Sequence, residues 1–215
     1  MLRNQLQRCL IILIAACALS AVSDDTAGPA KVASVPSPEH LNNSIGMKLI
    51  HIPVGNYLCY GRDIKPAYLF PKPKPGFNVK IERDFYIGGT EVTREQYQKI
   101  MGGGSSAALR LWRGIWSGDN DAESGNRPAN MVSWNDAVEF CRKLSELPAE
   151  KAAGRVYALP TEREWQYAAR AGSEFLFPYG NDDETRVAEV AVCRDIYTGA
   201  LPKGVQAVGT KKPNA

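Results

Sequence analysis

The sequence predicts a mixed α+β domain, and two observations carry this prediction. Between residues 50 and 87, apolar residues alternate with other residues in short runs, which is the period of half-buried strands. Between residues 93 and 172, three segments open with a capping box and continue with apolar residues three and four positions apart. That second pattern is typical of amphipathic helices that bury one face against a core.

The strands are expected in the first half of the chain. Ile50 to Val54 alternates, Val54-Gly55-Asn56 offers a turn, and Tyr57 to Tyr60 is expected to return beside the first strand. Phe77 to Ile81 alternates again, and Phe85-Tyr86-Ile87 follows as a further strand.

Two stretches are expected to be loops. The alternate prolines of Pro71 to Pro75 cannot sit inside a sheet, so this run is expected to be exposed and extended. Residues Gly102 to Met131 are rich in Gly, Ser, Asp and Asn and are expected to form a long connection. The glycines at its start are not followed by Gly-Lys-Ser/Thr, so a phosphate-binding loop is not indicated.

Three helices are predicted from their first residues. Thr93 with Gln96, Ser133 with Asp136 and Thr161 with Glu164 form capping boxes, and Gly172 is expected to close the third helix. Trp134 and Trp165 are expected to anchor the core. The expected buried faces are Tyr97, Ile100 and Met101; Trp134, Ala137, Val138, Cys141 and Leu144; and Trp165, Ala168 and Ala169.

Residues 1–23 have the pattern of a signal peptide. Arg3 and Arg8 precede the apolar run Cys9 to Leu19, and the small residues before Asp24 suit a cleavage site. The run is shorter than the roughly 20 apolar residues that a membrane anchor needs. We therefore expect an exported protein, periplasmic or extracellular, with no transmembrane segment after cleavage. Lipoprotein anchoring at Cys17 is the minor alternative.

A small, polar, Pro-containing linker is expected at residues 24–41, followed by one folded domain at 42–215. The chain of 215 residues is 44% hydrophobic and 23% charged, as in a globular protein. Its formal net charge is +3, from 26 basic and 23 acidic residues. Without Arg3 and Arg8 the balance is nearly neutral, so a nucleic-acid partner is not expected.

Three cysteines, Cys59, Cys141 and Cys193, lie outside the predicted signal peptide. An odd number cannot pair completely among themselves in an oxidising compartment. At least one is expected to stay reduced, to pair with another chain, or to pair with a cysteine outside this sequence. No Cys-x-x-Cys spacing is present, so a zinc site or a redox motif is not supported.

Six motifs in order make the sequence resemble the formylglycine-generating-enzyme, or sulfatase-modifying-factor, family. They are Asn43 to Gly55, Phe85 to Gly88 with Glu91 to Tyr97, Pro128 with Val132 to Ala137, Leu159 to Gly172, Phe177 to Asn181, and Val208 to Ala215. The amino-acid sequences of these motifs resemble those of secreted bacterial paralogues more than those of the animal enzymes. The resemblance covers nearly everything from Asn43 onward.

The resemblance implies a formylglycine-generating-enzyme-like (C-type-lectin-like) mixed fold with little regular secondary structure. Catalytic relatives oxidise a sulfatase cysteine to formylglycine with oxygen and a copper ion held by two cysteines, and calcium ions brace the fold. In those relatives the copper cysteines and a calcium-binding segment follow the motif that ends here at Ala215. The domain is therefore expected to be incomplete at its C-terminus, without catalytic, cofactor-binding or metal-binding residues of its own. By the same resemblance, Cys141 corresponds to a structural cysteine with a distant partner.

Two other candidate sites can be weighed from the residues. Asp182, Asp183 and Glu184, with Glu189 and Asp195, could supply oxygen ligands to calcium or form a solvated acidic turn. The second candidate, a histidine metal triad, is excluded because the sequence holds only two histidines, His40 and His51.

Glu162 and Glu164 are two positions apart on a helix, so they are not expected to form an acid–base pair. The favoured expectation is a truncated, inactive member of the family, with a sulfatase polypeptide or another protein as partner. The alternative is a non-catalytic secreted binding domain on the same fold.

Overall fold

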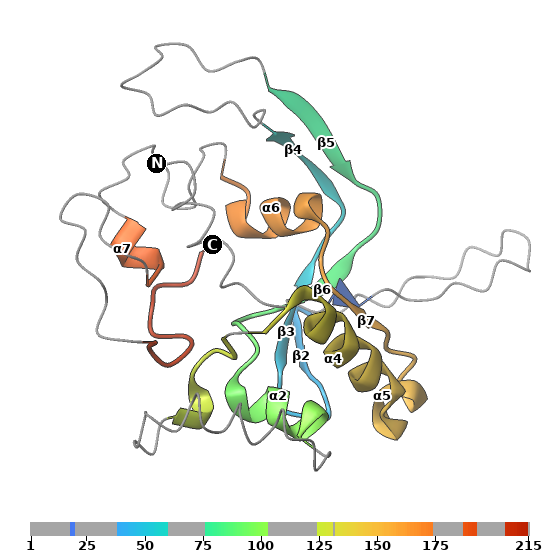
Figure 1. The fold of residues 1–215 in the computed structure, drawn as a ribbon. Helices are drawn as coiled ribbons and strands as arrows, with labels where there is room; N and C mark the ends of the chain where they lie inside the picture. The colour runs from blue at the N-terminus through green and yellow to red at the C-terminus, as the bar shows by residue number, and fades with distance from the viewer. Residues whose placement is uncertain are drawn as a thin grey trace, which may run out of the picture.

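The computed structural model describes residues 18–19, 38–59, 76–102, 124–130, 132–173, 187–192 and 205–214. Its strands form a five-stranded sheet of order β2-β3-β6-β1-β7 and a two-stranded sheet of β4 and β5 (Figure 1). The strands are β1 Ala18–Leu19, β2 His40–Asn42, β3 Lys48–Ile52, β4 Gly55–Cys59, β5 Phe77–Ile81, β6 Phe85–Gly88 and β7 Tyr157–Ala158. The helices are α2 Arg94–Met101, α4 Trp134–Glu146, α5 Pro148–Ala152, α6 Glu162–Arg170 and α7 Val187–Val190, with a 3-10 turn, η1, at Ser124–Asn126.

A tight turn joins β2 to β3. The Asn43 side-chain oxygen accepts hydrogen bonds from the backbone N–H groups of Ile45 and Met47, at 3.2 and 2.8 Å. Gly46 has φ +83°, a conformation that glycine adopts without steric cost. β2 begins at His40, two residues before the predicted start of the domain.

Strand β6 is buried on both of its faces, which explains its uninterrupted apolar sequence. It pairs with β3 in an antiparallel register that places Tyr86 opposite His51 and Phe85 opposite Ile52. Tyr86 points to the main core, whereas Phe85 and Ile87 belong to a second cluster with Tyr167 of α6. The sheet is therefore covered on both sides.

The predicted return of the chain beside β3 is wrong. β4 pairs with β5 instead, with Tyr57 opposite Val79, and Figure 1 shows this pair extending away from the larger sheet. Both edges of β3 are already taken, one by β2 and the other by β6. The expected strands at 77–81 and 85–87 are confirmed.

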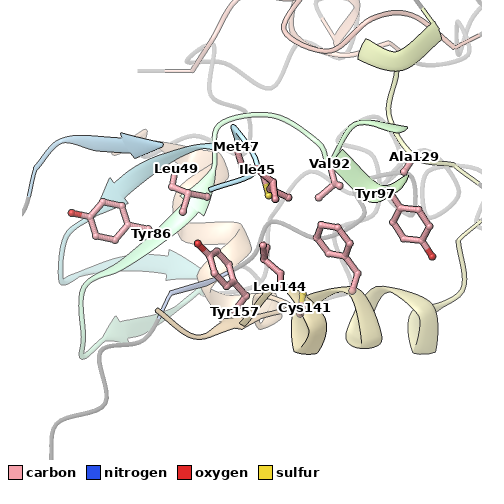
Figure 2. Close-up of a cluster of buried hydrophobic side chains, with 11 residues drawn as sticks. Ile45, Met47, Leu49, Tyr86, Val92, Tyr97, Ala129, Cys141, Leu144 and Tyr157 are labelled. Atoms are coloured by element: carbon pink, nitrogen blue, oxygen red, sulfur yellow. The ribbon is translucent and has the colours of Figure 1, made fainter. Parts of the chain in front are cut away.

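The main core lies between the large sheet and helices α2 and α4. Figure 2 shows the side chains of Leu49, Met47 and Val92 facing Leu144 and Cys141 of α4. Leu49 and Leu144 are completely buried. The rings of Tyr97 and Phe140 stack 5.6 Å apart at 12°, which joins α2 to α4.

The three predicted helix starts are confirmed. Thr93, Ser133 and Thr161 each cap a helix in the predicted box, with both hydrogen bonds present. The third helix ends at Arg170, where Ala171 takes the left-handed cap conformation and Gly172 follows at φ +78°. Because capping is a local interaction, the sequence was sufficient to locate these ends.

The prediction that Trp134 anchors the core is wrong. Trp134 is the first residue of α4 and is 71% exposed, and Val138, one turn later, is also exposed. The buried residues of α4 are Ala137, Phe140, Cys141 and Leu144. Of these, Phe140 was not part of the predicted buried face. Trp165, Ala168 and Ala169 of α6 are only half-buried.

Several predictions fall outside the described residues. These are Pro71 to Pro75, residues 103–123 of the long connection, and residues 24–37 of the linker. Of the predicted signal peptide, only Ala18 and Leu19 are described. In the part of the chain that the structure describes, no helix is both long enough and apolar enough to cross a bilayer.

The shifted face of α4 makes a direct prediction. Phe140→Ala should lower the free energy of unfolding by about 3–5 kcal/mol, because it empties a fully buried site and removes the stack on Tyr97. Trp134→Ala, on the same helix, should change it by less than about 0.5 kcal/mol because the indole is exposed. Urea unfolding of both variants measures the difference. A larger loss for Trp134→Ala would contradict this placement.

Candidate functional site

The most buried charged group in the described residues is the carboxylate of Glu150 on α5. It is completely buried and accepts hydrogen bonds from Ser44, Tyr157 and Arg155. The backbone N–H of Ser44 donates at 2.7 Å, the Tyr157 hydroxyl at 2.5 Å and the Arg155 guanidinium at 3.3 Å. The carboxylate thereby ties the β2–β3 turn and β7 to α5.

These hydrogen bonds decide the ionisation of the cluster. Burial alone would raise the pKa of Glu150, but the hydrogen bonds from Ser44, Tyr157 and Arg155 outweigh burial and the pKa is lowered. Burial and the hydrogen bond to Glu150 raise the pKa of Tyr157. Glu150 is held ionised and Tyr157 protonated, an arrangement that stabilises the fold and leaves no proton to exchange with a substrate near neutral pH.

A second polar cluster joins β4 to α6. The side-chain oxygen of Gln166 accepts from the Tyr57 hydroxyl at 3.2 Å and from the Cys59 thiol at 3.4 Å. The Arg170 guanidinium lies 5.4 Å from the centre of the Tyr57 ring, a cation–π distance. This Tyr57–Gln166 cluster is the one place in the described chain where a half-buried thiol meets other polar side chains.

The chemistry available to this cluster is limited. Burial and the nearby Cys59 raise the pKa of Tyr57, against the opposing effect of Arg170, so the phenol stays protonated. The Cys59 thiol donates its proton to an amide oxygen, whereas a nucleophilic or metal-binding cysteine acts as the thiolate. The cluster fits a structural link between β4 and α6 better than a catalytic centre.

The two histidines do not form a metal site. His51 Nε2 lies 2.9 Å from a carboxylate oxygen of Asp84, with the His51 ring beside Tyr86, and His40 lies in β2. On α6, Glu164 is bonded to Thr161 as its capping partner, while Glu162 accepts from Gln166. The two glutamates therefore have different hydrogen-bond partners.

The two described thiols, Cys59 and Cys141, do not form the copper site that the resemblance implies. That site is formed by two cysteines, but Cys59 is on β4 and Cys141 is buried in the main core at 2% exposure. Within the described ranges, no group of three His, Cys, Asp or Glu side chains could hold a metal ion. Of the proposed calcium ligands, only Glu189 on α7 is described. Asp182, Asp183, Glu184 and Asp195 lie outside the described residues, as does Cys193.

Several of the sequence motifs hold separate parts of the chain together. Asn214 donates from its amide to the carbonyls of Ala168 and Ala169, at 2.9 and 3.1 Å, at the end of α6. The backbone N–H of Val208 donates to Asn126 in η1, and Pro128 forms a bridge with Thr93 at the start of α2. The described residues of these motifs therefore stabilise the fold, and the motifs indicate a fold rather than a reaction.

Comparison with known proteins agrees with this description. The profile of the FGE-sulfatase family, described as the sulfatase-modifying factor enzyme 1-like domain, matches residues 35–215. The chain belongs to this family. The fold is also similar to the structure of PvdO from Pseudomonas aeruginosa, with a TM-score of 0.57 and 22% identity, over 84% of this chain and 70% of that one. The predicted formylglycine-generating-enzyme-like α+β fold is confirmed.

The family includes both active and inactive relatives. The chain is 38% identical to the mouse formylglycine-generating enzyme over 78 residues, which are 36% of this chain and 17% of the enzyme. It is 33% identical to the bovine inactive C-alpha-formylglycine-generating enzyme 2 over 105 residues, which are 46% of this chain and 29% of that protein. The matches thus span less than a third of either curated relative.

Sequence analysis missed both polar clusters. Glu150 lies between Pro148 and Lys151 in the sequence, and no pattern there predicts that its side chain is buried. Its hydrogen-bond partner Ser44 is 106 positions away. Gln166 is likewise 109 positions from Tyr57. The one available signal was the capping box of α6, which fixes where Gln166 lies on that helix.

The lowered pKa of Glu150 makes a pH-dependent prediction. Its contribution to stability is fully present above the unfolded-state pKa, near 4.3, and is lost as pH falls through the lower folded-state value. Glu150→Gln should lose about 2–4 kcal/mol at pH 7, because Tyr157 and Arg155 lose a charged acceptor. Between pH 5 and pH 3, the free energy of unfolding of the variant should then fall by less than that of the wild type.

Denaturant unfolding at several pH values measures this effect. Glu146→Gln is the control, because Glu146 is exposed and pairs with Arg142 on the surface of α4. Equal unfolding midpoints for Glu150→Gln and the wild type at pH 7 would contradict the proposed role of the carboxylate.

The close approach of α6 to β4 makes a second prediction. A Cβ atom at Gly55 would overlap the Tyr167 hydroxyl and lie 3.1 Å from its ring carbon Cζ. Gly55→Ala should therefore destabilise the domain by about 1–3 kcal/mol, and adding Tyr167→Phe should restore part of that loss. Gly125→Ala is the control, since its Cβ would make only ordinary contacts, the nearest at 3.7 Å. Thermal melts that show no rescue by Tyr167→Phe would refute this contact.

Proposed function

We propose that the 215-residue chain is an exported member of the sulfatase-modifying-factor family that does not oxidise peptidyl cysteine by itself. The observation that carries this proposal is the separation of the two described thiols. Cys59 belongs to the Tyr57–Gln166 cluster, while Cys141 packs among the apolar side chains of the main core. The copper chemistry that the family resemblance implies uses two cysteines together at a site that a peptide can enter.

Export is supported by the sequence at the N-terminus. Arg3 and Arg8 precede the apolar run Cys9 to Leu19 and a cleavage site after Ser23, which is the pattern of a signal peptide. The destination we propose is the periplasm or the extracellular space.

The role we propose for the domain is the binding of another polypeptide, with a sulfatase as the first candidate. The similarity to the bovine inactive C-alpha-formylglycine-generating enzyme 2 extends over more of the chain than the similarity to the mouse enzyme, which supports a role other than oxidation. The residues of the recognisable motifs that the structure describes hold the fold together, so the scaffold is kept without a requirement for oxidation.

An oxidation assay tests the proposal directly. The purified chain is incubated in air with copper and a sulfatase-derived peptide that contains the target cysteine, and aldehyde formation is followed by mass spectrometry. The mouse formylglycine-generating enzyme serves as the positive control. We expect no aldehyde above the protein-free background, and conversion by this chain would overturn the proposal.

The same peptide, labelled with a fluorophore, tests binding by anisotropy. A binding domain should bind the original peptide and a peptide in which serine replaces the cysteine with similar Kd values. A Kd that depends on the cysteine, together with conversion, would indicate an oxidase instead.

A further inference from the structure

The strand that joins β7 to the rest of the large sheet comes from the predicted export signal. β1, Ala18–Leu19, pairs antiparallel with β6 on one side and with β7 on the other. Figure 1 shows it as a short dark-blue arrow beside these two strands. Leu19 is opposite Tyr86 and Tyr157, and both of these residues are buried. The sheet is therefore complete only if the mature protein keeps Ala18 and Leu19.

Two cleavage positions in the signal segment have opposite consequences for this strand. Cleavage after Ser23 would remove β1 from the mature chain. The backbone groups of β6 and β7 that pair with β1 would then lose their partners, beside a Tyr157 side chain that is 4% exposed. Cleavage before Cys17 would leave β1 in place, because Ala18 and Leu19 follow Cys17 directly. The sheet therefore favours cleavage before Cys17.

The residues before Cys17 independently fit this second position. The segment Ile14-Ala15-Ala16 places a branched apolar residue three positions before the cysteine and two small residues directly before it. This is the pattern at which lipoprotein precursors are modified and cut, and a positively charged start and an apolar run precede it here, as in those precursors. The apolar run continues past Cys17 as Ala18 and Leu19 because these two residues form a strand of the domain.

The surface at the N-terminal end of β1 leaves room for a membrane anchor. Because β1 is antiparallel to β6 and β7, its N-terminal end lies beside their C-terminal ends. There Gly89 and Thr90 follow β6 and Ala158 ends β7, and all three residues are exposed. A lipid attached to the residue before β1 can therefore reach a bilayer without crossing the core.

We propose that Cys17 is the lipid-modified first residue of the mature protein and anchors the domain to the outer face of a membrane. This inference rests on the export proposed above. The Cys17 Sγ attacks the diacylglyceryl carbon of phosphatidylglycerol: a C–S bond forms, the C–O bond to the phosphate breaks, and glycerol phosphate leaves with the thiol proton. Water then hydrolyses the peptide bond between Ala16 and Cys17.

The modification changes the role of the segments on either side of β1. The two acyl chains of the diacylglyceryl group give stable anchoring, which a single chain does not. The predicted linker at 24–41 then lies between β1 and the rest of the domain, so that it no longer separates the domain from the anchor. The domain is held at the bilayer surface by the residue that precedes β1.

Metabolic labelling tests the proposal, and Cys9 provides a matched control. Cys9 lies in the same apolar run but directly follows Arg8, without the residues that precede Cys17. The full chain is expressed in a bacterial host that processes lipoproteins, with an alkyne analogue of palmitate in the medium. We expect the wild type and Cys9→Ser to carry the label in the membrane fraction and Cys17→Ser to fall to background. Mass spectrometry should find a mature N-terminus at Cys17 with a diacylglyceryl group.

The outcomes separate this inference from the proposed export. An exported protein whose N-terminus is Asp24 would overturn the lipid anchor and leave export intact. Label that persists in Cys17→Ser, or that is lost equally in Cys9→Ser, would also overturn the anchor. An uncleaved, unlabelled chain inside the cell would overturn both the anchor and export.

The retained strand is tested by a pair of variants of the processed protein in detergent. Leu19→Pro should lower the Tm by roughly 5–10 °C, because it removes a backbone donor from a strand that is paired on both sides. Val32→Pro, in the predicted linker, is the matched control and should leave the Tm unchanged. Circular dichroism melts that give equal Tm values for the two variants would overturn the role of β1 on which the choice of Cys17 rests.

Discussion

The buried carboxylate of Glu150 is the constraint on which the rest of the described structure depends. It is the meeting point of the β2–β3 turn, through Ser44, and of β7, through Tyr157. Burying a charge is costly unless hydrogen bonds and an opposite charge compensate it, and here Arg155 supplies the charge. A carboxylate in this position fixes segments that the sequence separates by about a hundred residues.

The position of β7 follows from this carboxylate. The Tyr157 hydroxyl donates to Glu150 and the Tyr157 backbone N–H donates to Ser145. The opposite backbone edge of β7 is therefore the one that pairs within the sheet. β6 is fixed on its far side by β3. β6 and β7 thus each have contacts besides those with β1, β6 with β3 and β7 with α4 and α5.

The sequence predicted what depends on neighbouring residues and failed where distant contacts decide. All three capping boxes were correct because a serine or threonine and its partner three residues later interact locally. Trp134 satisfied the spacing of the buried stripe, yet the stacking of Phe140 on Tyr97 rotated the buried face away from it. Likewise, β4 had a plausible turn before it, but β6 had already taken the edge of β3. Neither competitor is visible in a local pattern.

The same distinction separates the fold from the function. The motifs that identify the family, such as Asn214 at the end of α6 and Thr93 at the start of α2, satisfy backbone groups. The chain is similar both to a formylglycine-generating enzyme and to a relative named as inactive, so family membership alone does not establish a reaction. The chemistry of a member must come from side chains that the fold leaves available. In the described residues the thiols and carboxylates considered above take part in internal hydrogen bonds, in helix caps or in the core.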